Sequence, residues 1–135
     1  MTEAEKIVAG MLEQDAFSRW LGIEVVEVKP GKAVLRMTVR ENMLNGHGVC
    51  HGGVSFALAD TALAFAVNAH GRRAASIEGS ITYPAPAHEG DVLIATAEEQ
   101  ALRNRIGVYN VVVENQHHRR VGLFRGIAYR TDKDG

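Results

Sequence analysis

Hydrophobic positions along the chain first recur at a helical spacing, then alternate with polar ones, and then fill one long run. Between residues 3 and 20 they predict an amphipathic helix, with one apolar face made of Ile7, Val8, Met11, Leu12, Phe17 and Trp20. Thr2 fits the N-cap, with Glu5 as its capping-box partner three residues on, and Gly22 fits the stop signal. The pattern therefore predicts a short N-terminal helix.

Strand patterns follow on both sides of the long apolar run. Residues 33–40 alternate apolar and polar side chains, which is typical of a half-buried strand, and residues 23–29 also look like a strand. Pro30 and Gly31 favour a turn between them, so we expect the two to pair as a hairpin. Four further strands are predicted near the C-terminus, over residues 74–83, 91–102, 106–115 and 120–130.

The apolar run at residues 53–69 predicts a helix that is hydrophobic on nearly every side. Such a helix has to be buried all round. One antiparallel sheet that curls around the helix, together with a second subunit, would bury it. A two-layer α+β sandwich would leave one side of the helix exposed to solvent. The order of elements therefore predicts an α+β hotdog fold: an antiparallel sheet wrapped around a long central helix, as a single domain over residues 1–135.

Composition narrows the class of protein. The chain has 135 residues, 46% of them hydrophobic and 23% charged, with a net charge of -1, which argues against a nucleic-acid or membrane-surface binder. The single cysteine excludes an intrachain disulfide, and the N-terminus lacks the pattern of a signal peptide. The longest apolar stretch, residues 62–67, is too short to span a bilayer. We therefore expect a cytoplasmic protein.

Asp60 is the one carboxylate within the predicted central helix. Burying an ionised carboxylate costs several kcal/mol, and the apolar neighbours at helical spacing, such as Phe56 and Leu63, cannot bond to it. Asp60 therefore either meets a polar partner from elsewhere or lines a cavity, where desolvation makes carboxylates basic. A structural hydrogen bond across an interface is the alternative.

Gly52 and Gly53 open the same helix. Their N–H groups have no partner within the helix, and the missing side chains let a ligand approach closely. This predicts an oxyanion hole for a thioester or ester carbonyl, although a tight turn would also explain two glycines. Asp60 lies about 12 Å further along the helix, so a two-fold dimer with antiparallel helices would bring one subunit's Asp60 to the other's Gly52.

Other residues of the preceding loop allow accessory or rival chemistry. Asn45 carries a donor and an acceptor that could hold a carbonyl or a water, and His51 could brace the loop or donate to substrate. A Cys50–His51 nucleophile is disfavoured because sequence neighbours usually point apart and no third member is evident. A metal site from His47, His51 and Asp60 is disfavoured because the loop does not hold the two histidines in helical register.

The joined pattern of this region resembles the hotdog-fold thioesterases of the PaaI type, which act on phenylacetyl-CoA and hydroxyphenylacetyl-CoA. The resemblance lies in Asn45-Gly46-His47, Cys50-His51-Gly52-Gly53, Phe56, Leu58 to Ala62, and Asn68 near Gly71. A second block, from Gly107-Val108-Tyr109 through Asn115-Gln116 to Leu123-Phe124-Arg125-Gly126, is also similar to the PaaI proteins. Together the two blocks extend the resemblance over essentially the whole chain.

The resemblance implies a role for each matching residue. Asp60 matches the catalytic carboxylate, which acts as general base on water or as nucleophile. The N–H of Gly52, with Gly53 beside it, matches the donor that polarises the carbonyl. Asn45 and His51 match positions that orient the substrate and the loop.

Three further positions are expected to meet the substrate. Ser76 matches a small polar residue near the attacking water in some relatives, and Phe56 and Leu44 are expected to shape the acyl pocket. The resemblance also implies a homotetramer built as a dimer of dimers, with no metal and no cofactor beyond the CoA that the substrate carries.

These observations predict an acyl-CoA thioesterase that releases CoA from phenylacetyl-CoA or a ring-hydroxylated form of it during phenylacetate breakdown. A non-catalytic acyl-CoA-binding subunit would need the pocket but not Asp60. A hotdog thioesterase of other acyl specificity, medium-chain or aryl, fits the same residues. Acyl-CoA dehydration usually relies on a histidine with a flanking pattern that this chain lacks.

Overall fold

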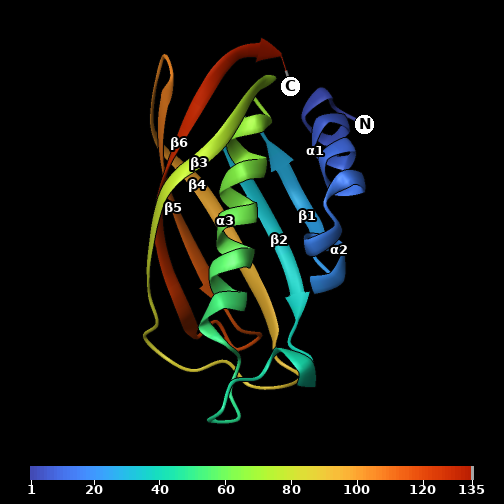
Figure 1. Ribbon diagram of the computed structural model, residues 1–135, viewed down its shortest axis with the longest axis vertical. Coiled ribbons are helices and arrows are strands. Elements are labelled where there is room, and N and C mark those ends of the chain that lie inside the picture. The colour runs from blue at the N-terminus through green and yellow to red at the C-terminus, as the bar shows by residue number, and fades with distance from the viewer. Residues whose placement is uncertain (135) are drawn as a thin grey trace.

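A computed structural model describes residues 1–134 of the chain. Its six strands form one antiparallel sheet in the order β1-β2-β4-β5-β6-β3, and the longest helix, α3, lies across one face of this sheet (Figure 1). The elements are α1 (Glu3–Gln14), α2 (Ala16–Leu21), β1 (Glu24–Lys29), β2 (Lys32–Thr38), the 3-10 turn η1 (Glu41–Met43), α3 (Gly52–Asn68), β3 (Arg72–Thr82), β4 (Val92–Arg103), β5 (Ile106–Glu114) and β6 (Arg120–Asp134). This confirms the α+β hotdog architecture and the β1–β2 hairpin.

The N-terminal helix expected over residues 3–20 is in fact two helices. The Thr2–Glu5 capping box is present, but α1 ends at Asp15, whose side chain then caps α2 by accepting from the Ser18 N–H at 3.0 Å. Asp15 leaves the helical conformation, with φ -97° and ψ 86°, and Phe17 and Trp20 do not continue the buried face of α1. They stack on each other at 6.2 Å between ring centroids and remain 57% and 49% exposed.

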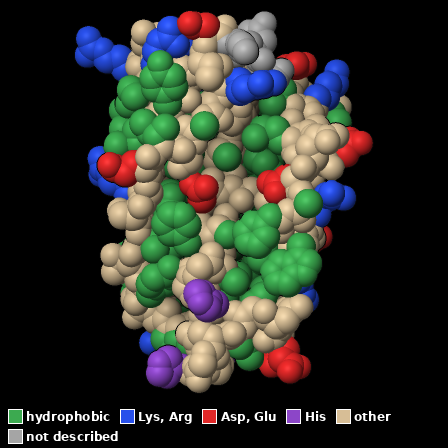
Figure 2. Space-filling model, viewed as in Figure 1, with side chains coloured by type: hydrophobic (Ala, Val, Ile, Leu, Met, Phe, Trp, Pro, Cys, Tyr) green, Lys and Arg blue, Asp and Glu red, His purple; other side chains and the backbone are tan. Residues whose placement is uncertain are grey.

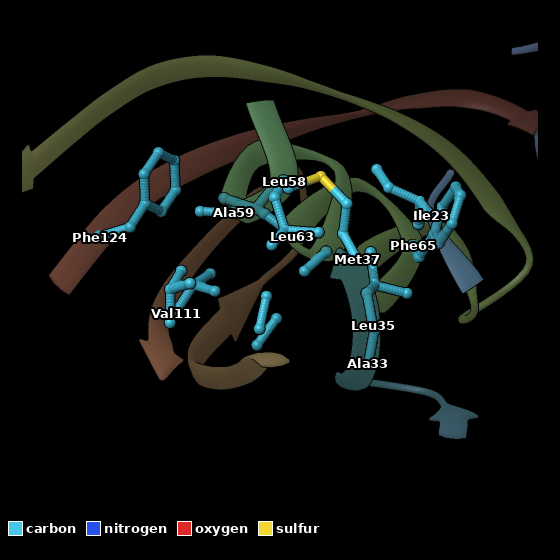
Figure 3. Packing of buried hydrophobic residues seen from close by; sticks show 14 of the residues in the cluster. Ile23, Ala33, Leu35, Met37, Leu58, Ala59, Leu63, Phe65, Val111 and Phe124 are labelled. Atoms are coloured by element: carbon cyan, nitrogen blue, oxygen red, sulfur yellow. The ribbon is translucent and has the colours of Figure 1, made fainter. Parts of the chain in front are cut away.

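The sheet-facing side of α3 forms the centre of the core. Leu58, Ala59 and Leu63 are fully buried there, against Leu35 and Met37 of β2 and neighbouring side chains of the other strands (Figure 3). This packing explains why the side of the helix that faces the sheet is apolar.

The opposite side of α3 is only half-buried in the single chain. Phe56, Ala57, Asp60 and Ala64 recur there at helical spacing, and all four keep part of their surface exposed. Figure 2 shows this face of the molecule, with hydrophobic side chains gathered over it and a few acidic groups between them. The expectation that α3 is buried all round therefore holds within one chain only for the side that contacts the sheet.

Strand β3 forms one edge of the sheet and is tied to the end of α3. The buried Asn68 side chain accepts from the Ala74 N–H at 3.0 Å and donates to the Ala74 and Ala64 carbonyls at 3.0 and 2.8 Å. One side of β3 pairs with β6, and within residues 1–134 its other side pairs with no strand. This leaves a free strand edge beside the half-buried side of α3.

Candidate active site

The loop before α3 is closed into a tight turn by Asn45. Its side-chain oxygen accepts from the N–H groups of His47 and Val49 at 2.9 and 3.3 Å, and its own N–H bonds to the Val49 carbonyl at 2.8 Å. The oxygen of Asn45 therefore holds the loop. Its amide NH2 has no acceptor in the described part of the chain and lies at the cavity beside Gly52. Of the two functions expected for Asn45, donation to a ligand is the one still available.

His51 is the N-cap of α3. Its Nδ1 accepts from the Gly53 N–H at 2.9 Å, which requires a ring nitrogen with a free lone pair and leaves Nε2 as the donor of the neutral ring. The bracing function considered for His51 is therefore present. The cap also occupies the N–H of Gly53, so the two donors expected at this helix start are reduced to one.

The remaining donor is the N–H of Gly52, which meets no acceptor among residues 1–134. The peptide unit that carries this N–H is fixed through its carbonyl, which belongs to His51. This carbonyl accepts from the Val54 N–H at 2.9 Å and from the Cys50 thiol at 3.6 Å. The carbonyl of Gly52 itself accepts from the Tyr83 hydroxyl at 2.6 Å. A fixed, unpaired N–H at a helix start, where the macrodipole is positive, favours binding of a carbonyl oxygen that gains negative charge.

A cavity of about 340 Å³ borders this donor. One wall comes from the loop and the start of α3, including Asn45, Gly52 and Ser55, and the other comes from residues 83–87. Both segments meet at the end of the molecule where α3 begins (Figure 1). The cavity therefore has an apolar wall, which Tyr-Pro-Ala-Pro-Ala supplies, and a polar wall that carries the free N–H.

Cys50 does not have the environment of a nucleophile. The residue is buried, and burial raises the pKa of its thiol, so that the unreactive protonated form is favoured. Its sulfur lies 3.6 Å from the His51 carbonyl and 4.0 Å from the Ser55 hydroxyl, and no imidazole hydrogen bond to it is found in residues 1–134. The disfavoured Cys50–His51 pair is thus absent from the structure.

Asp60 lies on the half-buried side of α3, two helical turns beyond Gly52. Its carboxylate forms no hydrogen bond or ion pair with residues 1–132, the part of the chain whose side chains are described. A rise of about 1.5 Å per residue separates the two backbone positions by roughly 12 Å, and Asp60 is not part of the cavity lining. One chain therefore does not bring Asp60 and Gly52 together.

The three residues expected at the substrate lie elsewhere around this centre. Phe56 packs edge-on against Phe124 at 5.2 Å between ring centroids, and Leu44 forms an isolated bridge with Cys50. Ser76 is half-buried on β3, opposite Ala128 and next to a bulge. None of the three lines the cavity beside Gly52.

Tyr83 and the segment after it were not found by sequence reasoning. They touch Gly52 only through the fold, 31 residues apart in the chain. The one signal was the Pro84–Pro86 segment after a strand, which was interpreted only as a break between strands.

No metal centre is evident at the site. Among the described side chains, residues 1–132, no group of three or more His, Cys, Asp or Glu is placed to hold an ion. His47, His51 and Asp60, considered above as a metal site, do not form such a group. No helix in this part of the chain is long and apolar enough to cross a membrane.

The fold and this loop-and-helix motif define a thioesterase domain, and the comparisons agree. Residues 47–121 match the model of the thioesterase superfamily, and the chain belongs to that family. It is 43% identical to the acyl-coenzyme A thioesterase PaaI of Escherichia coli, over 89% of this chain and 86% of that protein.

Solved structures give the same result. The structure of E. coli PaaI, a protein from the phenylacetic acid degradation operon, matches with a TM-score of 0.95 at 40% identity, covering 98% of this chain and 96% of the other. A hypothetical thioesterase from Streptococcus pneumoniae, solved with coenzyme A, matches with a TM-score of 0.87 at 25% identity over 93% and 98% of the two chains.

Proposed function

We propose that this chain is an acyl-CoA thioesterase that hydrolyses phenylacetyl-CoA, or a ring-hydroxylated form of it, to the free acid and CoA. The observation that carries the proposal is the unpaired N–H of Gly52 at the start of α3, held at the wall of a cavity. The similarity to E. coli PaaI, an acyl-CoA thioesterase from a phenylacetic acid degradation operon, supports the choice of substrate.

The reaction follows from the chemistry of these groups. The thioester oxygen accepts from the Gly52 N–H, which stabilises the negative charge that develops as water attacks. Removing such a donor from other enzymes costs about 2.7–4 kcal/mol of transition-state stabilisation. Asp60 acts as general base and takes a proton from the water. The tetrahedral intermediate then collapses and breaks the carbon–sulfur bond. The departing CoA thiolate takes up the proton held by Asp60, which leaves the free acid, CoA and an ionised Asp60.

Because one chain separates Asp60 from Gly52, the proposal requires a second copy. The half-buried side of α3 and the free edge of β3 lie side by side and offer a continuous surface for it. A two-fold axis perpendicular to α3 would run the two α3 helices antiparallel and form two sites, each with Gly52 from one chain and Asp60 from the other. A dimer of such dimers is the assembly that the proposal expects.

Two further expectations belong to the proposal. It needs no cofactor besides the CoA of the substrate, and it expects the reaction to take place in the cytoplasm. The S. pneumoniae relative solved with coenzyme A supports CoA as the carrier group.

A non-catalytic acyl-CoA-binding subunit is the competing function, and Asp60 separates the two. Such a subunit would have no need of a carboxylate on the half-buried face of α3. The test is the Asp60→Asn variant, which keeps the shape and removes the base, assayed by thiol release from phenylacetyl-CoA. We expect wild-type turnover and a loss in the variant of at least a hundredfold, the scale of general-base catalysis. Equal rates would refute the assignment of Asp60, and binding of phenylacetyl-CoA by the wild type without turnover would favour the binding subunit.

A further inference from the structure

We propose that Tyr83 is a positioning residue for this reaction, holding the first turn of α3 so that the N–H of Gly52 points steadily at the thioester oxygen. The inference rests on the proposed function and extends it to a residue outside the loop and helix that carry the motif. Tyr83 directly follows strand β3 and reaches across the cavity end to the start of α3.

The geometry involves the two peptide units that flank Gly52. The Tyr83 hydroxyl donates to the Gly52 carbonyl at 2.6 Å, and the N–H of that same peptide unit, from Gly53, donates to His51 Nδ1 at 2.9 Å. The preceding peptide unit is fixed through the His51 carbonyl, which accepts from the Val54 N–H at 2.9 Å. The peptide unit that carries the free N–H and the one that follows it are therefore both held in place.

A glycine needs this support more than another residue would. Without a Cβ, its backbone dihedral angles are the least restricted of any residue, so the direction of the N–H depends on what holds its neighbours. A Cβ added at Gly52 would lie 2.9 Å from both Cζ and Oη of Tyr83. The phenol thus occupies the space in which a side chain at this position would stand, and it replaces that side chain as the restraint on the backbone.

The hydroxyl keeps its proton at ordinary pH. Burial raises the pKa of Tyr83, and the nearby Cys50 contributes to the same direction, so the group stays a donor. Tyr83 is nevertheless 46% exposed at the rim of the cavity, and an exposed hydrogen bond that water can replace contributes little to global stability. Loss of the hydroxyl should therefore affect turnover much more than folding.

The test is the Tyr83→Phe variant, which keeps the ring and removes the donor. We expect kcat for phenylacetyl-CoA to fall about tenfold with KM within about twofold, because a loosened donor loses transition-state stabilisation rather than ground-state binding. The melting temperature should stay near that of the wild type. Tyr129→Phe is the matched control, because Tyr129 lies on β6 and is a similarly exposed tyrosine outside the cavity; its kcat should not change.

A second pair of variants tests the coupling through space. In the wild-type background, Gly52→Ala should lower kcat, because the new Cβ meets the Tyr83 phenol. In the Tyr83→Ala background, where that space is empty, the same change should lower kcat several-fold less. The effects of the two substitutions on kcat should therefore not be additive.

The outcomes separate this inference from the proposed function. If Asp60→Asn abolishes turnover while Tyr83→Phe keeps wild-type kcat, the inference is wrong and the function stands. Strict additivity of Gly52→Ala and Tyr83→Ala would also overturn it. A parallel loss of kcat and melting temperature in Tyr83→Phe would show a merely structural role and overturn it as well.

Discussion

Replacing Gly52 by proline removes the proposed oxyanion donor and adds side-chain atoms beside Tyr83, so the variant needs a control that adds a Cβ and keeps the N–H. Gly52 is the first residue of α3, and its N–H meets no acceptor among residues 1–134. Proline is well tolerated at this helical position because its missing N–H is one of the unpaired groups anyway. His51 has φ -60° and ψ 133°, which is the conformation that suits a residue before proline.

The matched control is Gly52→Ala. Both variants place a Cβ at 2.9 Å from the Tyr83 phenol, so the phenol has to move in both. Only alanine keeps the N–H. The ratio of their rates therefore isolates the donor. The loss of one oxyanion-hole donor lowers kcat by about 10² to 10³, or about 2.7–4 kcal/mol, so Gly52→Pro should be slower than Gly52→Ala by about this factor.

The assay is steady-state thiol release from phenylacetyl-CoA, with thermal melting of both variants alongside. The melting temperatures should agree closely, since proline removes no protein hydrogen bond here. If the two variants have kcat values within about threefold of each other while both are folded, the Gly52 N–H is not the donor, and the reasoning from the unpaired helix start is refuted.

Three further predictions concern the fold, pH and cofactors. Tyr109→Phe should lower the free energy of unfolding in urea by about 1.5–3 kcal/mol, because the buried hydroxyl donates to Glu99 at 2.6 Å; an unchanged value would contradict this. Desolvation alone would raise the pKa of Asp91, but hydrogen bonds from the His88 N–H and the Gln116 side chain outweigh it and lower that pKa. The ionised Asp91 carboxylate therefore stabilises the folded protein above its unfolded pKa, and this contribution is lost as the pH falls through the lower folded pKa. Asp91→Asn should lower the melting temperature at pH 7. It should have the melting temperature of the wild type in acid well below pH about 4. Exhaustive dialysis against EDTA should leave kcat unchanged, and a loss restored by a divalent ion would show that the account lacks a metal.

The sequence predicted the architecture because long hydrophobic patterns determine it. The run at residues 53–69 could only be a buried helix, and the alternating segments could only be strands. The break at Asp15 was missed, since an amphipathic pattern over residues 3–20 fits one helix as well as two. A single aspartate that caps the following turn decides between them.

The features of the candidate site that depend on neighbouring residues in the sequence could be predicted, and those that depend on contacts made by the fold could not. Gly52 and Asp60 follow from a helix start and from a charge among apolar neighbours. The occupation of the Gly53 N–H by His51 depends on a side-chain rotamer. The sequence suggested that His51 could brace the loop but not which N–H it would occupy. The contact of Tyr83 with Gly52 depends on how β3 returns toward the start of α3, and Pro84 and Pro86 indicate only that the strand ends there.

Complementation between two inactive variants tests whether Gly52 and Asp60 act together across two copies of the chain. Gly52→Pro and Asp60→Asn chains, each inactive alone, are co-expressed in equal amounts and purified together. Random pairing then restores about one quarter of the wild-type sites, since Gly52 from one chain meets Asp60 from the other. We expect the mixture to have about 25% of the wild-type kcat per chain. Activity no greater than that of the separate variants, with mixed oligomers demonstrated by two different tags, would contradict it.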